Sequence, residues 1–324
     1  MKLCLRCIII FTSLCFFCIH CTNKEFIYSK FIVGSTCDVT FYIENDSIAN
    51  DIMLEIDAEL IRIDSLLNRF SELSLVSELN RTQGIKAPQD IIQLVLLSDS
   101  VSRITDGLFD ISIAPLIELW GFYEHELNKP DTAEINQAKN LVDYKKIQVG
   151  KDSIIIPAGM KLDLGGIAQG FAADRVKMIL KKYNVISALI NIGGEIALIG
   201  QSPKGRPWRI GIKHPRGEGI IETVELKDEA LSTSGDYEKF FIINNKRYSH
   251  IINPKTGFPA LNFVSVTIFA SSAAFADAIA TAVSVMGSDK GTKFLDSLGI
   301  RGIIYYEENG CLQRVENNGE KSAR

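Results

Sequence analysis

The sequence predicts a mixed α/β (α+β) domain with largely antiparallel sheets and helices packed against them. Strand-like segments outnumber helix-like ones, and most of them follow one another through short turns. The helix-like segments do not alternate regularly with strands, as they would in βαβ units. The chain has 324 residues, 46% hydrophobic and 23% charged, which is enough to bury a large core.

The first third of the chain predicts strands followed by two amphipathic helices. Gly34-Ser35-Thr36 interrupts an alternating apolar pattern, so this part forms either a strand pair or one bent strand. Ser47 is a suitable N-cap for the first helix, and Asp106-Gly107 ends the second. In chain order, the predicted segments are strands at 26–43, a helix at 47–68, a polar loop at 70–80 and a helix at 88–105.

The remainder predicts hairpins and two further helices. Gly150-Lys151-Asp152 and Asn244-Asn245 each separate two strand-like stretches, which is typical of hairpin turns. The predicted segments are strands at 145–149, 153–156 and 161–164, a helix at 167–182, strands at 188–192, 195–200, 208–213, 222–226, 240–243, 247–252 and 264–269, and an Ala-rich helix at 272–286.

Residues 1–21 predict a processing segment, which leaves 22–324 as one folded domain. Lys2 and Arg6 precede an apolar run at 8–19 that is too short to span a bilayer. Cys21 follows this run and resembles the cysteine of a bacterial lipoprotein signal, which becomes the acylated first residue. An uncleaved N-terminal anchor is the alternative. Both interpretations predict a membrane-anchored protein on the extracytoplasmic, periplasmic face.

Charge and cysteine content exclude two classes of protein. The net charge is −4 and the isoelectric point about 5.7, and the basic residues are scattered, so the sequence predicts no nucleic-acid partner. Five of the seven cysteines lie within the first 21 residues, so the folded body has no disulfide framework typical of small secreted domains.

Two diglycines follow predicted strands and are candidates for close backbone approach to a ligand. Gly165-Gly166 leads directly into the helix at 167–182, whose first amides can bind a phosphate. Asp163, at the strand end, can accept a hydrogen bond from a ribityl or ribose hydroxyl or orient a metal-bound water. A tight turn capped by Asp163 is the alternative. The second diglycine, in Asn191-Ile192-Gly193-Gly194-Glu195, fits a packed strand crossing equally well.

Two later stretches carry further candidates. The polar stretch 232–237 follows a predicted strand end at Ala230-Leu231 and either lines a phosphate or flavin pocket or forms a turn. His250 lies in an alternating strand just before the turn at Asn253-Pro254. A histidine at a strand end can act as a general base near neutral pH, although a lone histidine is more often a core residue with its hydrogen bonds satisfied.

Asp277 and Thr281 lie four residues apart in the helix at 272–286 and therefore share one face. A carboxylate and a hydroxyl suit a hard cation such as Mg²⁺, which also takes waters and phosphate oxygens. A single Asp–Thr hydrogen bond within an Ala-rich core helix is the alternative interpretation.

Taken together, these motifs resemble the ApbE family of FAD:protein FMN transferases over residues 31–310. Their order along the chain makes the resemblance far more specific than any single motif. The residues that carry it are Phe109-Asp110, Pro115-Leu116, Leu119-Trp120-Gly121-Phe122, Leu162-Asp163-Leu164-Gly165-Gly166-Ile167-Ala168, Asn191-Ile192-Gly193-Gly194-Glu195, Ser234-Gly235-Asp236-Tyr237, Arg247-Tyr248-Ser249-His250 and Ala276-Asp277-Ala278-Ile279-Ala280-Thr281-Ala282.

The resemblance implies an ApbE-type fold related to the tunnelling fold, with FAD in a cleft. The chain departs from the family at Gln169, where the family often has Lys or Glu, at Val33, where it often has Met, and at Asn253, where it has Asp. The implied Mg²⁺ ligands are Asp277, Thr281 and the backbone carbonyl of Gly166. The implied FAD contacts are Val33, Phe109, Asp110, Asp163, Gln169, His250 and Ala280.

The implied reaction is Mg²⁺-dependent transfer of FMN from FAD, through a phosphoester bond, to a threonine or serine of an acceptor protein, with release of AMP. His250 and Asp277 are the catalytic candidates: His250 would take the proton of the hydroxyl, and Asp277 would hold the cation. The implied partners are flavoprotein subunits of extracytoplasmic redox complexes. A Mg²⁺-dependent FAD pyrophosphatase and a non-catalytic FAD-binding lipoprotein are the alternatives.

Overall fold

The computed structural model describes residues 23–122, 129–244 and 246–319. The predicted processing segment 1–21, with Cys21, lies outside these residues. Within the described ranges, no helix has the length and apolar character needed to cross a membrane.

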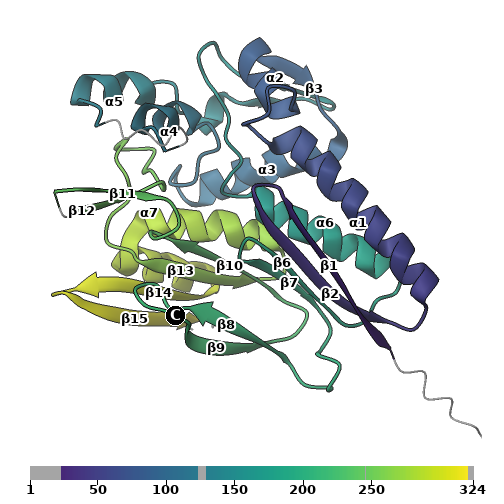
Figure 1. Cartoon of the computed structure of the whole chain (residues 1–324). Coiled ribbons are helices and arrows are strands. Elements are labelled where there is room, and N and C mark those ends of the chain that lie inside the picture. The colour runs from purple at the N-terminus through teal and green to yellow at the C-terminus, as the bar shows by residue number, and fades with distance from the viewer. Residues whose placement is uncertain (1–22, 123–128, 245, 320–324) are drawn as a thin grey trace, which may run out of the picture.

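An eight-stranded sheet with the order β1-β2-β6-β7-β10-β13-β14-β15 forms the centre of the molecule (Figure 1). Every pair of neighbouring strands is antiparallel, as the sequence predicts. The strands are β1 (Lys24–Ile32), β2 (Ser35–Ile43), β6 (Ala188–Ile192), β7 (Glu195–Ile199), β10 (Ala230–Gly235), β13 (Ser265–Ala270), β14 (Arg301–Glu308) and β15 (Cys311–Asn318).

Three long helices cover one face of this sheet: α1 (Asp46–Leu67), α6 (Ala168–Lys182) and α7 (Ala273–Leu298) (Figure 1). The apolar residues of α1 recur at helical spacing and therefore share one face, as expected of an amphipathic helix. On this face Ile52, Ile56, Leu60 and Ile63 are completely buried. On the other face, the hairpin of β8 (Trp208–Lys213) and β9 (Ile220–Leu226) encloses a smaller apolar cluster. Helix, sheet and hairpin thus form three layers.

The remaining elements lie mainly around one end of the sheet (Figure 1). They are α2 (Leu75–Thr82), β3 (Gly84–Lys86), α3 (Gln89–Ile104), α4 (Ala114–Trp120), α5 (Thr132–Lys139), the 3₁₀ helix η1 (Tyr144–Lys146), β4 (Gln148–Val149), β5 (Ser153–Ile155), β11 (Phe240–Ile243) and β12 (Lys246–Ser249).

The structure corrects the predictions for the polar parts of the first half. Helix α1 is capped by Asn45, whose side chain accepts hydrogen bonds from two backbone amides, and Ser47 lies inside the helix. The predicted loop at 70–80 contains most of α2, which Ser74 caps and which buries Val76 and Leu79. Two buried apolar residues and a cap are enough for a short helix in a tertiary context.

Two later predictions are also corrected. Residues 161–164 do not form a strand, because only an isolated bridge joins Lys161 to Ile113. Ala230-Leu231 begins strand β10 rather than ending one, so residues 232–235 of the polar stretch belong to the sheet. The helix predicted at 272–286 is confirmed, because Gly287 directly after it adopts a non-helical conformation (φ 77°, ψ 177°), and a further helical segment of α7 continues to Leu298.

Helices α6 and α7 cross at Gly170, where a side chain has no space. A Cβ atom at this position would lie 2.4 Å from the carbonyl oxygen of Ala273. We expect Gly170→Ala to destabilise the fold by about 1–3 kcal/mol, because the helices would have to separate. Urea unfolding measures this change. Gly84→Ala is the control, since its new Cβ would meet nothing closer than 3.8 Å, and equal midpoints for the two variants would contradict the prediction.

Candidate active site

A cavity of about 720 Å³ opens where the central sheet separates. Strands β7 and β10 pair only through Ala230 and Leu231, and the residues beyond this pair line the cavity. The opposite wall comes from the ends of α1 and α7, the β1–β2 turn and the diglycine turn before α6. The volume is in the range of cavities that enclose a complete small-molecule ligand.

The cavity brings together all but one of the site residues predicted from the sequence. Ala280 does not line it, and its side chain is fully buried in the core of α7. The predicted residues that line the cavity are Val33, Phe109, Asp110, Asp163, Gly166, Gln169, His250, Asp277 and Thr281.

The seam between α6 and α7 positions the predicted metal ligands. Asp174 of α6 accepts hydrogen bonds from the Ala273 and Ala274 amides (2.9 and 3.0 Å), so it caps the start of α7. Four residues into α7, Oδ2 of Asp277 accepts a hydrogen bond from the Gly170 amide at 3.2 Å. Each helix thus satisfies polar groups of the other, which fixes the wall of the cavity that carries Asp277.

The Gln169 side chain joins the β1–β2 turn to α6. Its Nε2 donates a hydrogen bond to the backbone carbonyl of Val33 at 3.3 Å. Val33 has φ 55°, which is unusual for a β-branched residue and costs conformational energy. Gly193 faces the same amide, because a Cβ there would lie 2.8 Å from Oε1 of Gln169. The uncharged Gln169 therefore binds the β1–β2 turn and lies against the second diglycine turn at the edge of the cavity.

Besides Asp110, which is described below, three carboxyl groups that line the cavity have raised pKa values. Burial raises the pKa of Asp277 to about 7, and the charge of Glu238 adds to this, while the Gly170 amide opposes it. Burial, together with the charges of Asp277 and Glu238, raises the pKa of Glu195 well above its ordinary value. Burial raises the pKa of Glu238 to about 7, although the charges of Lys239 and Lys213 oppose this. Such a group of acids favours a cation in the cavity.

The residues present fit a hard divalent cation. Within the described part of the chain, Oδ1 of Asp277 and the Thr281 hydroxyl make no hydrogen bond, so both oxygens are available. A Cβ on Gly166 would lie 3.0 Å from Oγ1 of Thr281, so the turn and the hydroxyl are close. No group of three or more His, Cys, Asp or Glu side chains in the described residues is arranged to hold a metal. A cation here would therefore also need backbone, water or substrate oxygens, as Mg²⁺ commonly does.

His250 faces the cavity as a neutral imidazole. Both its backbone amide and its Nδ1 contact the carbonyl oxygen of Lys239, at 3.0 and 3.2 Å. Because a carbonyl oxygen only accepts hydrogen bonds, Nδ1 carries the proton and Nε2 keeps a free electron pair. Burial lowers the pKa of His250 to about 4. The ring is thus unprotonated at neutral pH and can accept a proton at Nε2.

Two acidic residues of the predicted motifs fix loops around the cavity. Asp110 accepts hydrogen bonds from the Ser112 and Tyr144 amides (2.8 and 3.0 Å), and burial raises its pKa. Asp236 forms a bidentate ion pair with Arg216, with both N–O distances 2.7 Å. These contacts hold the segments that place Phe109 and the end of β10 at the cavity.

The raised pKa of Asp277 predicts a pH-dependent stability. Its ordinary value is 3.8, so the folded chain retains a proton that the unfolded chain releases. The resulting stabilisation is complete below about pH 4 and is lost as the pH rises through about 7. We expect the melting temperature in EDTA to fall between about pH 5 and pH 8, and Asp277→Asn to reduce this fall by several degrees because asparagine does not ionise.

Two other groups serve as references for this measurement. Glu238→Gln should act in the same direction, since Glu238 also titrates near 7. His250 has the opposite sign: its pKa is lowered from 6.5, so its contribution is present above about pH 6.5 and is lost as the pH falls through about 4. The prediction would be contradicted if the melting temperature of Asp277→Asn fell with pH as steeply as that of the wild type.

The sequence did not indicate several ionisable residues of the cavity, among them Arg69, Glu195 and Glu238. Glu195 belongs to a predicted diglycine motif, and its position directly after the glycines was the one available signal. Arg69 lies between the helix predicted at 47–68 and the loop predicted at 70–80, and Glu238 follows the motif at 232–237. Nothing local in the sequence distinguishes these two from surface charges.

The chain is similar to curated proteins and solved structures that share this architecture. FAD:protein FMN transferases from Vibrio cholerae and Klebsiella pneumoniae are 32% and 30% identical to it, covering 80% and 83% of the chain and 80% and 85% of the relatives. The apo crystal structure of the Pseudomonas stutzeri flavinyl transferase ApbE superposes with a TM-score of 0.85 at 30% identity, covering 92% of this chain and 96% of that one. The ApbE protein of Thermotoga maritima superposes with a TM-score of 0.82 at 32% identity, covering 90% and 97%.

The fold and the cavity together define a transferase enzyme of the class to which these relatives belong. The model of the ApbE family matches residues 33–304, which include every site residue predicted from the sequence. The chain belongs to the ApbE family. This confirms the family and the mixed α/β fold that the motifs predicted.

Proposed function

We propose that this protein is a Mg²⁺-dependent FAD:protein FMN transferase. The observation that carries the proposal is the single cavity in which Asp277, Thr281 and Gly166 lie on one wall and His250 presents a free Nε2. Relatives at about 30% identity over most of their length carry this name, which supports FAD as the substrate.

In the proposed reaction, the hydroxyl oxygen of an acceptor serine or threonine bonds to the phosphorus on the FMN side of FAD. The bond from this phosphorus to the bridging oxygen breaks, and AMP leaves with that oxygen. Bound at Asp277, Thr281 and the Gly166 carbonyl, Mg²⁺ would supply charge neutralisation at the diphosphate. His250 takes the hydroxyl proton at Nε2. Asp277 supplies the negative charge that would bind the cation.

Incubation with FAD, Mg²⁺ and a candidate acceptor tests the proposal. The intact mass of the acceptor should increase by one FMN, and one AMP should appear for each FMN transferred. Free FMN at the same rate with and without acceptor would instead identify a pyrophosphatase. FAD binding without any AMP would identify a non-catalytic flavin carrier.

The proposed acceptors are flavoprotein subunits of extracytoplasmic redox complexes, and we propose that a lipid on Cys21 anchors the enzyme beside them. The supporting observation is the short apolar run at 8–19, after which only His20 precedes this cysteine. Cys21→Ser should move the protein from the membrane fraction to the soluble fraction. An unchanged membrane fraction would favour an uncleaved anchor.

A further inference from the structure

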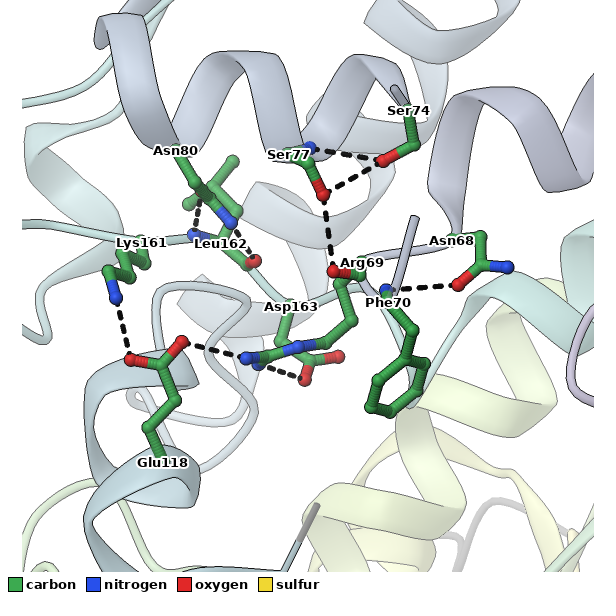
Figure 2. Close-up of polar contacts among 10 residues, drawn as sticks. All are labelled: Asn68, Arg69, Phe70, Ser74, Ser77, Asn80, Glu118, Lys161, Leu162 and Asp163. Atoms are coloured by element: carbon green, nitrogen blue, oxygen red, sulfur yellow. Dashed lines mark hydrogen bonds and ion pairs between the residues drawn. The ribbon is translucent and has the colours of Figure 1, made fainter. Parts of the chain in front are cut away.

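Arg69 lies between two carboxylates from different parts of the chain (Figure 2). Its Nη1 is 3.0 Å from Oδ2 of Asp163, and its Nη2 is 2.7 Å from Oε1 of Glu118 on α4. Lys161 pairs with the other oxygen of Glu118, at 2.7 Å. The Arg69 side chain is 15% exposed and that of Asp163 only 4%, so this pairing is well shielded from water.

Asp163 connects this ion pair to the diglycine turn. Its second oxygen, Oδ1, accepts a hydrogen bond from the Gly165 amide at 2.6 Å. A Cβ on Gly165 would lie 2.9 Å from the same oxygen, so the carboxylate is packed against the turn. The next residue, Gly166, faces Thr281. One carboxylate oxygen thus shapes the turn, while Arg69 holds the other and prevents the group from rotating.

Helix α2 fixes both segments that meet here. The Ser77 hydroxyl donates to the backbone carbonyl of Arg69 at 3.1 Å. Asn80 binds the backbone of Leu162 twice, accepting from its amide at 2.6 Å and donating to its carbonyl at 2.9 Å (Figure 2). Helix α2 therefore fixes the positions of both backbone segments, the one that carries Arg69 and the one that carries Asp163.

The charges argue against Arg69 as a phosphate ligand. Two cations, Arg69 and Lys161, face two anions, Glu118 and Asp163, so the cluster is neutral as a whole. Each carboxylate accepts one charge-assisted hydrogen bond from the guanidinium, at 3.0 Å for Asp163 and 2.7 Å for Glu118. The positive charge of Arg69 is therefore balanced by Glu118 and Asp163, and Arg69 affects a ligand only indirectly.

We infer that Arg69 is a positioning residue: through Asp163 it sets the Gly165-Gly166 turn that faces Thr281 and Asp277 across the proposed cation site. The inference deepens the proposed function and rests on it for the identity of the cation. Groups that orient metal ligands in this way typically change metal affinity by about 10–100-fold when they are removed.

Binding of Mn²⁺, as a paramagnetic substitute for Mg²⁺, tests this role without catalysis. With FAD present, the free Mn²⁺ signal in electron paramagnetic resonance gives the dissociation constant. Arg69→Met should raise this constant about tenfold. Arg69→Lys keeps the charge but replaces the two guanidinium nitrogens that bind the two carboxylates with one ammonium group, so it should have a smaller effect. This variant can be measured in place of Arg69→Met if Arg69→Met does not fold. Lys161→Met is the matched control, because it leaves the Arg69–Asp163 pair intact, and should bind Mn²⁺ like the wild type.

A double-mutant cycle with Asp163→Asn shows whether Arg69 acts through Asp163. If it does, Arg69→Met should have little further effect in the Asp163→Asn background. Equal Mn²⁺ binding by Arg69→Met and wild type, an equal loss in Lys161→Met, full additivity in the cycle, or no Mn²⁺ binding by the wild type would each overturn the inference. A wild type that binds Mn²⁺ and FAD but transfers no FMN would refute the proposed function alone.

Discussion

Asp277→Asn is expected to reduce FMN transfer by about 10²–10³-fold, the loss typical of removing one charge-stabilising group from an active site. Asparagine keeps the size and the hydrogen bond to Gly170 but cannot supply a negative charge. The turnover number should therefore fall, and higher Mg²⁺ concentrations should restore little of it. AMP release and the acceptor mass, measured over a Mg²⁺ titration, give the result.

Asp289→Asn is the matched control for this variant. Asp289 lies in α7 beyond the break at Gly287, is exposed and does not line the cavity, so transfer should be unchanged. If Asp277→Asn transferred FMN at the wild-type rate with the same Mg²⁺ requirement, the cation would have to be held elsewhere. The proposed mechanism would then be wrong, although the family assignment would stand.

His250→Ala is expected to lower the turnover number by about 10²–10⁴-fold, the range for loss of a general base. The low pKa of His250, about 4, gives the expectation a pH dependence. Because the ring is already neutral above about pH 5, wild-type activity should show no histidine titration between about pH 6 and pH 8. If activity rises over this range, we expect the cause to be ionisation of Asp277 and Glu238, whose pKa values are both about 7.

His214→Gln is the comparison for His250→Ala. His214 accepts a hydrogen bond from the Arg216 amide and does not line the cavity, so this variant should keep its activity. A full transfer rate in His250→Ala would rule out His250 as the base. The acceptor hydroxyl would then lose its proton to another group, such as Asp277 or a metal-bound water.

The sequence predicted those parts of the fold in which local pattern and tertiary environment agree. Helical spacing of apolar residues identified α1, α3 and α6, and the same spacing placed Asp277 and Thr281 on one face. Strand β10 was misplaced because its Ser and Thr residues suggested a turn, whereas Ser232 pairs with Ile268 of β13 and is completely buried. Strand formation depends strongly on such neighbours, which a local pattern does not contain.

The sequence did not predict the contacts that hold the site in place. Arg69 and Asp163 are 94 positions apart, and Gly170 and Asp277 are 107 apart. Each of these contacts depends on the packing of several elements, so no spacing in one segment indicates it. The family resemblance named Asp163 and Asp277, but the partners that orient them became visible only in the folded chain.

The crossing of α6 and α7 has a consequence for exchanging parts between family members. Asp174 caps α7, the Gly170 amide binds Asp277, and Gly170 itself must admit the backbone of Ala273. A chimera that takes only one of these helices from a relative would combine surfaces that were not selected to fit each other. In a chimera, α6 and α7 should therefore be exchanged together, as a pair from the same relative.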